Sequence, residues 1–399
     1  MIYTTLIGGT GNQMFQYAIA RSLSIDLKTD FSLILFYNNY FIDFFLKRES
    51  HDRYNLNHFN IKEKNSSILK FISAPILGKI KSDFNYIYEG NQYEFDIYNQ
   101  NIRNLKGDIF LKGYWHNEKY FLHNEDIIRE DFKIKTPPSE KNKSYIDEIF
   151  SVNAVALCVR RNDYLNPFWK AQLGICTLNY YKKSTDMIAK SIENPIFYVF
   201  SDDPEWVKKN IKLDYPTIYV THNGFDKDYE DLRLISSCKH FIISNSTFHW
   251  WGAWLSSNKD KIVIAPEPWL NSYTFEYTIP KKWNRIKCDR SELYEQSSNK
   301  IFELHNNDLT LNKSIKIKME FLKINSFNHD TIIKIVTDSK NKGILKLSNK
   351  ETKPIFIGYY RGLSIRYIYL DKTISLNSLK ISSVNNVPVK IKYIGIKSV

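Results

Sequence analysis

Cysteine and long hydrophobic runs are scarce in this sequence. Its 399 residues include four cysteines, which form no Cys-x-x-Cys pair and lack the spacing of zinc ligands, so we expect a reducing compartment and no zinc site. No apolar run approaches the ~18 residues of a membrane-spanning helix, and the N-terminus lacks the basic and apolar regions of a signal peptide. These absences predict a cytoplasmic protein, at most peripheral on the inner face of the cytoplasmic membrane.

Acidic residues are outnumbered by basic ones, mainly near the C-terminus. The chain has 56 Lys and Arg against 43 Asp and Glu, a net charge of +13. Residues 301–399 hold 17 basic and 7 acidic residues and therefore carry +10 of that total. This stretch is where an anionic membrane surface is expected to bind, and an ordinary solvated basic surface explains the charge equally well. No nucleic-acid partner is expected.

Length and composition predict a folded protein of two or three domains. Hydrophobic residues make up 43% and charged residues 25% of the chain, close to the averages of globular proteins. The Thr136-Pro137-Pro138 segment interrupts the pattern, and helical periodicity disappears after about residue 297. We therefore expect domains at residues 1–138, 139–297 and 298–399, the last a small all-β module of alternating segments.

The two larger domains are predicted to be α/β units. Residues 2–7 are apolar and lead into Gly8-Gly9-Thr10-Gly11 and a helical pattern, which is typical of a strand, a turn and a helix. The second domain has buried-type strands over residues 154–159, 196–200, 241–243 and 262–265. Polar residues directly follow the first three of these strands. Ligands of open α/β sheets bind at the carboxyl ends of the strands, so these polar groups are expected to converge on one site.

Three groups at that edge have the chemistry to bind a nucleoside diphosphate. Arg160 and Arg161 follow the first strand, and a guanidinium can bond two phosphate oxygens at once. Ser246 and Thr247 open a helix, whose backbone N–H groups favour a phosphate. Asp202 can accept the paired N–H donors of a guanine edge. Simpler explanations stay open for each group: a surface ion pair for the arginines, a helix cap for the hydroxyls, and a metal-binding acidic cluster or a cap for the aspartate.

Five ordered motifs carry a resemblance to a known family. They are Gly8-Gly9-Thr10-Gly11-Asn12-Gln13-Met14-Phe15-Gln16-Tyr17-Ala18; Gly113-Tyr114-Trp115 with Glu118-Lys119-Tyr120-Phe121; Val159-Arg160-Arg161-Asn162-Asp163-Tyr164; Phe200-Ser201-Asp202-Asp203; and Ser244-Asn245-Ser246-Thr247-Phe248-His249-Trp250-Trp251-Gly252-Ala253-Trp254-Leu255. Over residues 1–284 the chain resembles the bacterial α-1,2-fucosyltransferases, glycosyltransferase family eleven. Motifs of this length in this order are far more specific than a lone glycine pattern.

The resemblance implies a fold and a reaction. The fold is of the GT-B type, with two Rossmann-like α/β domains, and the resemblance does not extend to the C-terminal module. The reaction is an inverting, metal-independent transfer of L-fucose from GDP-β-L-fucose to a galactoside 2-hydroxyl, with no cofactor. The acceptor would be a glycan or a lipid-linked oligosaccharide in the synthesis of a bacterial O-antigen, lipooligosaccharide or capsule.

The resemblance also implies roles for individual residues. Arg160 is expected to act in catalysis by stabilising the diphosphate. Asp163 is a candidate base for the acceptor proton, and an equal alternative is that it orients the arginines; Glu118 and His249 are weaker candidates. The expected donor-binding residues are Gly11, Asn12, Gln13, Arg161, Asp202, Asn245, Ser246 and Thr247.

Two positions depart from the family pattern. Cys158 stands where the family usually has His, and Asn162 stands where it usually has Gly. We expect Asn162 to adopt a backbone conformation that glycine adopts more easily. Because of these departures, transfer of another GDP-sugar and a non-catalytic glycan-binding role stay open as alternatives.

Overall fold

The computed structural model describes residues 1–35, 54–62, 64–65, 84–88, 98–165, 173–270, 277–288, 300–311, 314–318, 331–348, 355–370, 378–383 and 389–398. The predicted boundary at residue 297 lies outside these residues. Within them, no helix is both long and apolar enough to cross a bilayer.

The N-terminal part contains a parallel sheet. Its strands are β1 (Ile2–Leu6), β2 (Phe31–Leu35), β3 (Lys64–Asn65), β4 (Phe84–Tyr88) and β5 (Asp108–Lys112), in the order β3-β2-β1-β5-β4. The helices described here are α1 (Thr10–Asp26), α4 (Glu125–Asp131) and the short η1 (Gln100–Asn104), η2 (Glu118–Tyr120) and η3 (Leu122–Asn124). Gly8 has a φ of 74°, a value that glycine adopts without strain, and it turns the chain from β1 into α1.

The central part contains a second parallel sheet. Its strands are β6 (Asn153–Val159), β7 (Pro195–Ser201), β8 (Thr217–Val220), β9 (His240–Ile242), β10 (Val263–Glu267) and β11 (Asn284–Lys287), in the order β11-β10-β9-β6-β7-β8. Its helices are α5 (Glu140–Ser151), η4 (Asp163–Leu165), α7 (Leu178–Ser191), α8 (Pro204–Asn210), η5 (Phe225–Lys227), α9 (Asp228–Ser237) and α10 (Thr247–Leu255). The strand order reverses at β6, which lies between β7 and β9, and such a reversal opens a crevice at the carboxyl edge.

Alternation along β6 divides the core into two layers. Ala154, Ala156 and Cys158 face one side, where α9 and α10 pack, while Val155 and Leu157 face the side covered by α7. Because side chains alternate along a strand, one buried strand contributes to both layers. The first layer continues without interruption into the core of the N-terminal sheet.

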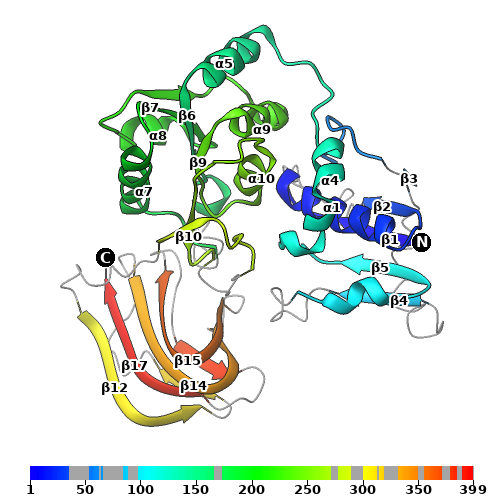
Figure 1. Cartoon of the computed structure of the whole chain (residues 1–399). Helices are drawn as coiled ribbons and strands as arrows, with labels where there is room; N and C mark the ends of the chain where they lie inside the picture. Colours follow the sequence, from blue (N-terminus) through cyan, green and yellow to red (C-terminus); the bar gives the residue numbers. More distant parts are fainter. Residues whose placement is uncertain are drawn as a thin grey trace, which may run out of the picture.

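The two parallel sheets therefore share one hydrophobic core, and α1 and α10 join them (Figure 1). The ring of Phe15 on α1 lies 4.6 Å from the ring of Trp250 and 4.9 Å from that of Trp251, both on α10. Trp251 Nε1 also donates to the carbonyl of Gly11 at 3.0 Å. The prediction of an α/β fold with two Rossmann-like units of the GT-B type is confirmed.

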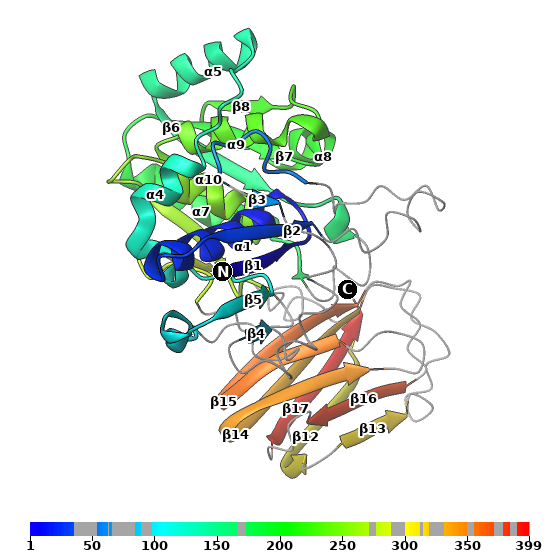
Figure 2. The same ribbon diagram turned by 90° about the vertical axis from the view of Figure 1, so that its right-hand side faces the viewer.

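A third sheet lies towards the C-terminus (Figure 2). Its strands are β12 (Lys300–Leu311), β13 (Ser314–Lys318), β14 (Thr331–Ser348), β15 (Ile355–Leu370), β16 (Ser378–Ser383) and β17 (Val389–Ser398), and all its pairings are antiparallel. The alternating segments of the sequence thus lie in strands. The existence of a separate all-β module at residues 298–399, like the other domain boundaries, stays a prediction.

Candidate active site

The loop after β6 carries Arg160 to the crevice of the second sheet. Its Nη1 lies 3.2 Å from Asp202 Oδ2, and its Nη2 lies 2.9 Å from Asp163 Oδ1. Burial opposes the charge of Arg160, but the two carboxylates outweigh burial and raise its pKa. The guanidinium is therefore a fixed positive charge, and 28% of the side chain is exposed to accept an anion.

Arg161 is held differently from its neighbour. Its Nε lies 3.1 Å from Asp203 Oδ2, and its guanidinium lies 3.7 Å from the ring centre of Trp206 on α8. These contacts direct the side chain towards α8, whereas Arg160 is close enough to His249 on α10 to affect its pKa. Arg160 is thus the arginine that approaches the start of α10, and a donor-binding role for Arg161 stays a prediction.

Asp202 organises the arginine loop. Its carboxylate accepts the backbone N–H groups of Arg161 at 2.8 Å and Asn162 at 3.0 Å, and Asn162 Nδ2 donates to its carbonyl. Burial raises the pKa of Asp202, while Arg160 and the two N–H groups lower it, with a net increase. The carboxylate that was expected to bind guanine is therefore engaged with the protein backbone, and its contact to a base stays a prediction.

The loop between β9 and α10 presents a helix N-terminus to the same crevice. Ser246 is the N-cap residue with an extended backbone, and its side chain makes no capping hydrogen bond. The first N–H groups of a helix lack intrahelical partners and carry partial positive charge. Ser246 and Thr247 therefore lie where the sequence predicted a phosphate-binding helix start, and their contact with a donor stays a prediction.

Hydrogen bonds of Asn245 connect this loop to the loop after β6. Its Nδ2 donates to the carbonyls of Leu173 at 2.9 Å and Gly174 at 3.1 Å, and its own carbonyl accepts the hydroxyl of Tyr164 at 3.0 Å. The side chain thus connects the loops after β6 and β9, and its contact with the donor stays a prediction.

Asn12 links the two sheets at the site. Its Oδ1 accepts a hydrogen bond from Thr247 Oγ1 at 2.9 Å and lies 3.1 Å from His116 Nε2. The neighbouring Gly11 lies so close to α10 that a Cβ there would be 2.4 Å from the backbone nitrogen of Phe248. Asn12 and Gly11 therefore lie at the junction of the sheets, and a contact of either residue with the donor stays a prediction.

Gln13 lies beneath this junction. It is 1% exposed, its Nε2 donates to the carbonyl of Gly8 at 2.9 Å, and its Oε1 accepts the backbone N–H of Asn55 at 3.0 Å. These hydrogen bonds brace the glycine turn. A direct contact of Gln13 with the donor stays a prediction.

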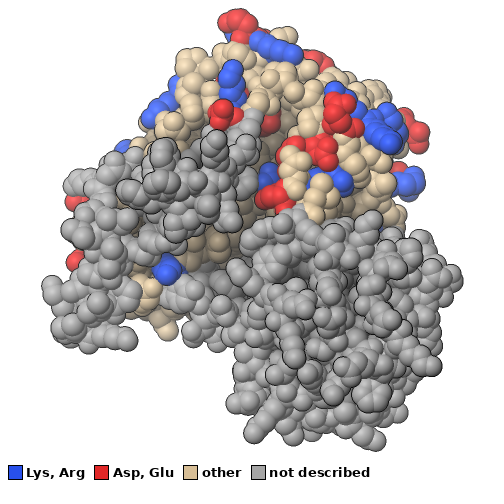
Figure 3. Space-filling view, turned by 180° about the vertical axis from the view of Figure 1, so that it is seen from behind, with Lys and Arg blue, Asp and Glu red and all other residues tan. Residues whose placement is uncertain are grey.

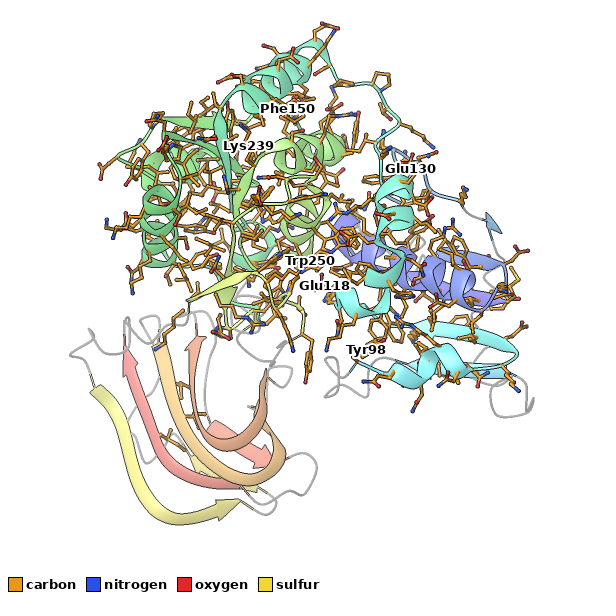
Figure 4. The ribbon with its side chains drawn as sticks, viewed as in Figure 1. Tyr98, Glu118, Glu130, Phe150, Lys239 and Trp250 are labelled. Carbon is orange, nitrogen blue, oxygen red and sulfur yellow. The ribbon has the colours of Figure 1, made fainter. Side chains whose placement is uncertain are left out.

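The three base candidates from the sequence have distinct surroundings. Asp163 forms the ion pair with Arg160, which is the arginine-orienting role that the sequence left open. His249 is 6% exposed, its Nδ1 lies 2.8 Å from Ser244 Oγ, and burial and the nearby Arg160 lower its pKa to about 3. Glu118 lies near the opposite end of α10, where its Oε2 accepts Trp254 Nε1 at 3.3 Å (Figure 4).

The two departures from the family pattern have structural consequences. Cys158 is fully buried in the core layer beneath the loop, and burial raises the pKa of its thiol. Asn162 does not have the expected glycine-like conformation: among the described residues other than glycine, positive φ occurs at Lys28, Trp115 and Asn194. That expectation was wrong because the side chain and N–H of Asn162 both bond Asp202, which holds an ordinary backbone conformation.

Sequence reasoning missed His116 and Asp228. His116 lies four residues after the end of β5, so the rule that ligands bind near the carboxyl ends of strands applied to this loop too. Asp228, the first residue of α9, accepts the hydroxyl of Thr10 across the sheets. That contact had no local signal, because 218 positions separate its partners.

The described residues show no acidic cluster fit for a metal: none of their His, Cys, Asp and Glu side chains form a group of three or more that could hold one. Figure 3 shows acidic and basic side chains interspersed over the described part of one face.

Comparisons with known proteins agree with the motif assignment. Residues 1–287 match the family model described as glycosyl transferase family 11. An α-1,2-colitosyltransferase of Escherichia coli is 32% identical over 72% of this chain and 99% of its own length. The O-antigen biosynthesis glycosyltransferase WbnK of Escherichia coli is 34% identical over 67% of this chain and 95% of its own length. The crystal structure of the fucosyltransferase NodZ from Bradyrhizobium covers 63% of this chain and 92% of its own, with 10% identity and a TM-score of 0.36.

Proposed function

The chain belongs to glycosyl transferase family 11, and we propose that it transfers L-fucose from GDP-β-L-fucose to the 2-hydroxyl of a galactoside. The product would be an α-1,2 linkage in a bacterial surface glycan such as an O-antigen, lipooligosaccharide or capsule. The similarity to an O-antigen glycosyltransferase supports this setting. The observation that carries the proposal is that the parallel neighbours β6 and β9 bring Arg160 and the uncapped start of α10 to the same edge of the sheet.

The proposed reaction is a single displacement. The acceptor hydroxyl attacks the anomeric carbon, and GDP leaves from the opposite face with the electron pair of the broken bond, so configuration inverts. Arg160 and the N–H groups at the start of α10 offset the charge that develops on the diphosphate, a form of preorganised electrostatic stabilisation. Asp202 and Asp163 contribute by holding the guanidinium in place.

A second candidate donor is a GDP-linked colitose. It is favoured by the 32% identity to an α-1,2-colitosyltransferase. Colitose is L-fucose without the 3-hydroxyl, so the two donors differ by one polar group. A site that hydrogen-bonds that hydroxyl would reject the deoxy sugar strongly, whereas a site without such a contact would accept both.

Donor turnover tests the proposal. GDP release is measured from GDP-fucose, GDP-colitose, GDP-mannose and UDP-galactose, with EDTA present, and with and without β-galactoside acceptors. Release from GDP-fucose that the acceptor stimulates and EDTA leaves intact is the expected result. Turnover of GDP-colitose alone would reassign the sugar, and donor binding without turnover for any acceptor would favour a glycan-binding role.

We also propose that residues 298–399 bring the enzyme to an anionic membrane surface that holds its acceptor. The support is the +10 charge of residues 301–399. Cosedimentation of the full chain with vesicles tests this. Binding to anionic vesicles that weakens as salt is added is expected, because salt screens charge, and equal binding to neutral vesicles would contradict it.

A further inference from the structure

His116 occupies a defined position between the two sheets. It follows Trp115, whose φ of 60° is rare for a bulky residue and turns the chain at the end of the β5 loop. Its Nε2 lies 3.1 Å from Asn12 Oδ1, the same oxygen that accepts the Thr247 hydroxyl at 2.9 Å. Two hydrogen bonds that share the Asn12 oxygen therefore connect the imidazole to the start of α10, where the diphosphate of the donor is proposed to bind.

The contact with Asn12 assigns the protons of the imidazole. A carboxamide oxygen only accepts hydrogen bonds, so His116 Nε2 must carry the proton and Nδ1 must carry the lone pair. The ring lies 5.1 Å from the ring of Phe15 and 5.3 Å from that of Tyr114, which fixes its orientation. His116 as a whole is partly buried.

The surroundings of His116 keep it neutral before substrates bind. Asn12 and Phe15 from α1 and Tyr114 from its own loop lie against the ring and are uncharged, and burial lowers the pKa of His116 to about 3. A bound diphosphate would place negative charge nearby and stabilise an imidazolium. The basicity of His116 would thus rise when the donor is in place.

The other base candidates have different surroundings. Asp163 is paired with Arg160, and His249 Nδ1 is bonded to Ser244 in the interior. Glu118 contacts Trp254, seven residues along α10 from Thr247, which is about 10 Å at 1.5 Å per residue. His116 is the candidate that shares a hydrogen-bond partner with the start of α10.

We propose that His116 is the catalytic base that accepts the proton of the acceptor hydroxyl through Nδ1. This inference rests on the proposed function. As the acceptor oxygen bonds to the anomeric carbon, its proton moves to Nδ1, and the electron pair of the sugar–phosphate bond leaves with GDP. The imidazolium then returns its proton to solvent, so atoms and charges balance.

The test compares two identical substitutions. In His116→Gln the side-chain amide can still donate to Asn12, but no basic nitrogen is left, and we expect kcat to fall about 100-fold. GDP affinity should change by less than about twofold, because His116 is not expected to bind the nucleotide. The matched control is His123→Gln on η3, where the histidine pairs with Asp26 outside the site; its kcat should equal that of the wild type.

A pH profile separates a base from a merely structural side chain. The wild type should lose kcat on the acid side at a higher pH than it loses kcat/KM, because kcat reports the complex with bound diphosphate. His116→Gln should lack this acid limb. If the Gln variant does not fold, His116→Gly with added imidazole replaces it: restored turnover supports the base, and no restoration in a folded variant that binds GDP contradicts it.

The outcomes distinguish this inference from the proposed function. If the wild type transfers sugar and His116→Gln retains more than about a third of its kcat with the acid limb intact, His116 is not the base while the proposed function stands. If the wild type transfers none of the tested sugars, the proposed function is contradicted, and the base assignment that rests on it is contradicted with it.

Discussion

The two parallel sheets meet at the site with edges of different character. The second sheet contributes charge: Arg160, the carboxylates that hold it, and the start of α10. The first sheet contributes Asn12 and His116, which carry no charge at neutral pH. A nucleoside diphosphate is anionic and sugar hydroxyls are neutral, so we propose from this difference that the donor's phosphates face the second sheet and the reacting hydroxyl faces the first.

Removing the positive charge of Arg160 from the edge of the second sheet should have the largest effect on kcat. We expect Arg160→Ala to lower kcat about 1,000-fold and to weaken GDP binding, because one preorganised donor aimed at developing charge contributes two to three orders of magnitude. Arg160→Lys should recover part of this loss, since it keeps the charge without the planar fork. Steady-state kinetics and circular dichroism check the prediction, with Arg103→Ala on η1 as the control. A near-normal rate for Arg160→Ala would contradict the assignment.

Forcing the two edges apart should have the next largest effect. In Gly11→Ala the new Cβ would lie 2.4 Å from the backbone nitrogen of Phe248, so α1 and α10 must separate. Such overpacking costs about 2 kcal/mol of unfolding free energy, and turnover should fall with it. Gly9→Ala is the matched control, because nothing lies within 4 Å of a Cβ at that position. Denaturant unfolding of both variants measures the difference, and equal stabilities would contradict the close approach.

Changing a partly buried carboxylate on α9 should have the smallest effect. Burial raises the pKa of Asp231 on α9 to about 7, with Asp228 and Glu230 adding to the shift and Asn223 opposing it. The folded state therefore holds a proton that the unfolded state releases at a lower pH, so stability should fall as pH rises from about 4 to 7 and then level off.

Asp231→Asn removes this titration and keeps an oxygen for Asn223. We expect it to raise the unfolding free energy by about 1 to 2 kcal/mol at pH 8 and much less at pH 5, since partial exposure reduces the full effect. Urea unfolding at the two pH values measures this. An equal change at both would show that Asp231 is ionised throughout.

Much of the fold was predictable because its strands are short, buried and apolar and end in polar residues. The arginine loop after β6 and the helix start after β9 were located in this way. Gln13 and Asn245 show the limit of such reasoning. Their amide groups bond the backbone of residues 55 and 173–174, and no local pattern reveals that a polar side chain will bond backbone that is distant in the sequence.

His116 shows a different limit. The motif that contains His116 was recognised in the sequence. The role proposed for His116 depends on its contact with Asn12, which lies 104 positions away. Only packing of the β5 loop against α1 places the imidazole beside an oxygen that also contacts α10. The sequence predicts the polar residues at each strand end separately. Only the three-dimensional structure shows which residues of the two sheets lie beside one another.

The most direct test of this division between the edges is calorimetric titration of GDP into the wild type, Arg160→Ala and His116→Gln. If the second edge binds the diphosphate and the first edge serves the reacting hydroxyl, Arg160→Ala should weaken GDP binding at least tenfold, while His116→Gln binds GDP as the wild type does. Equal weakening in both variants, or weakening in His116→Gln alone, would contradict the account.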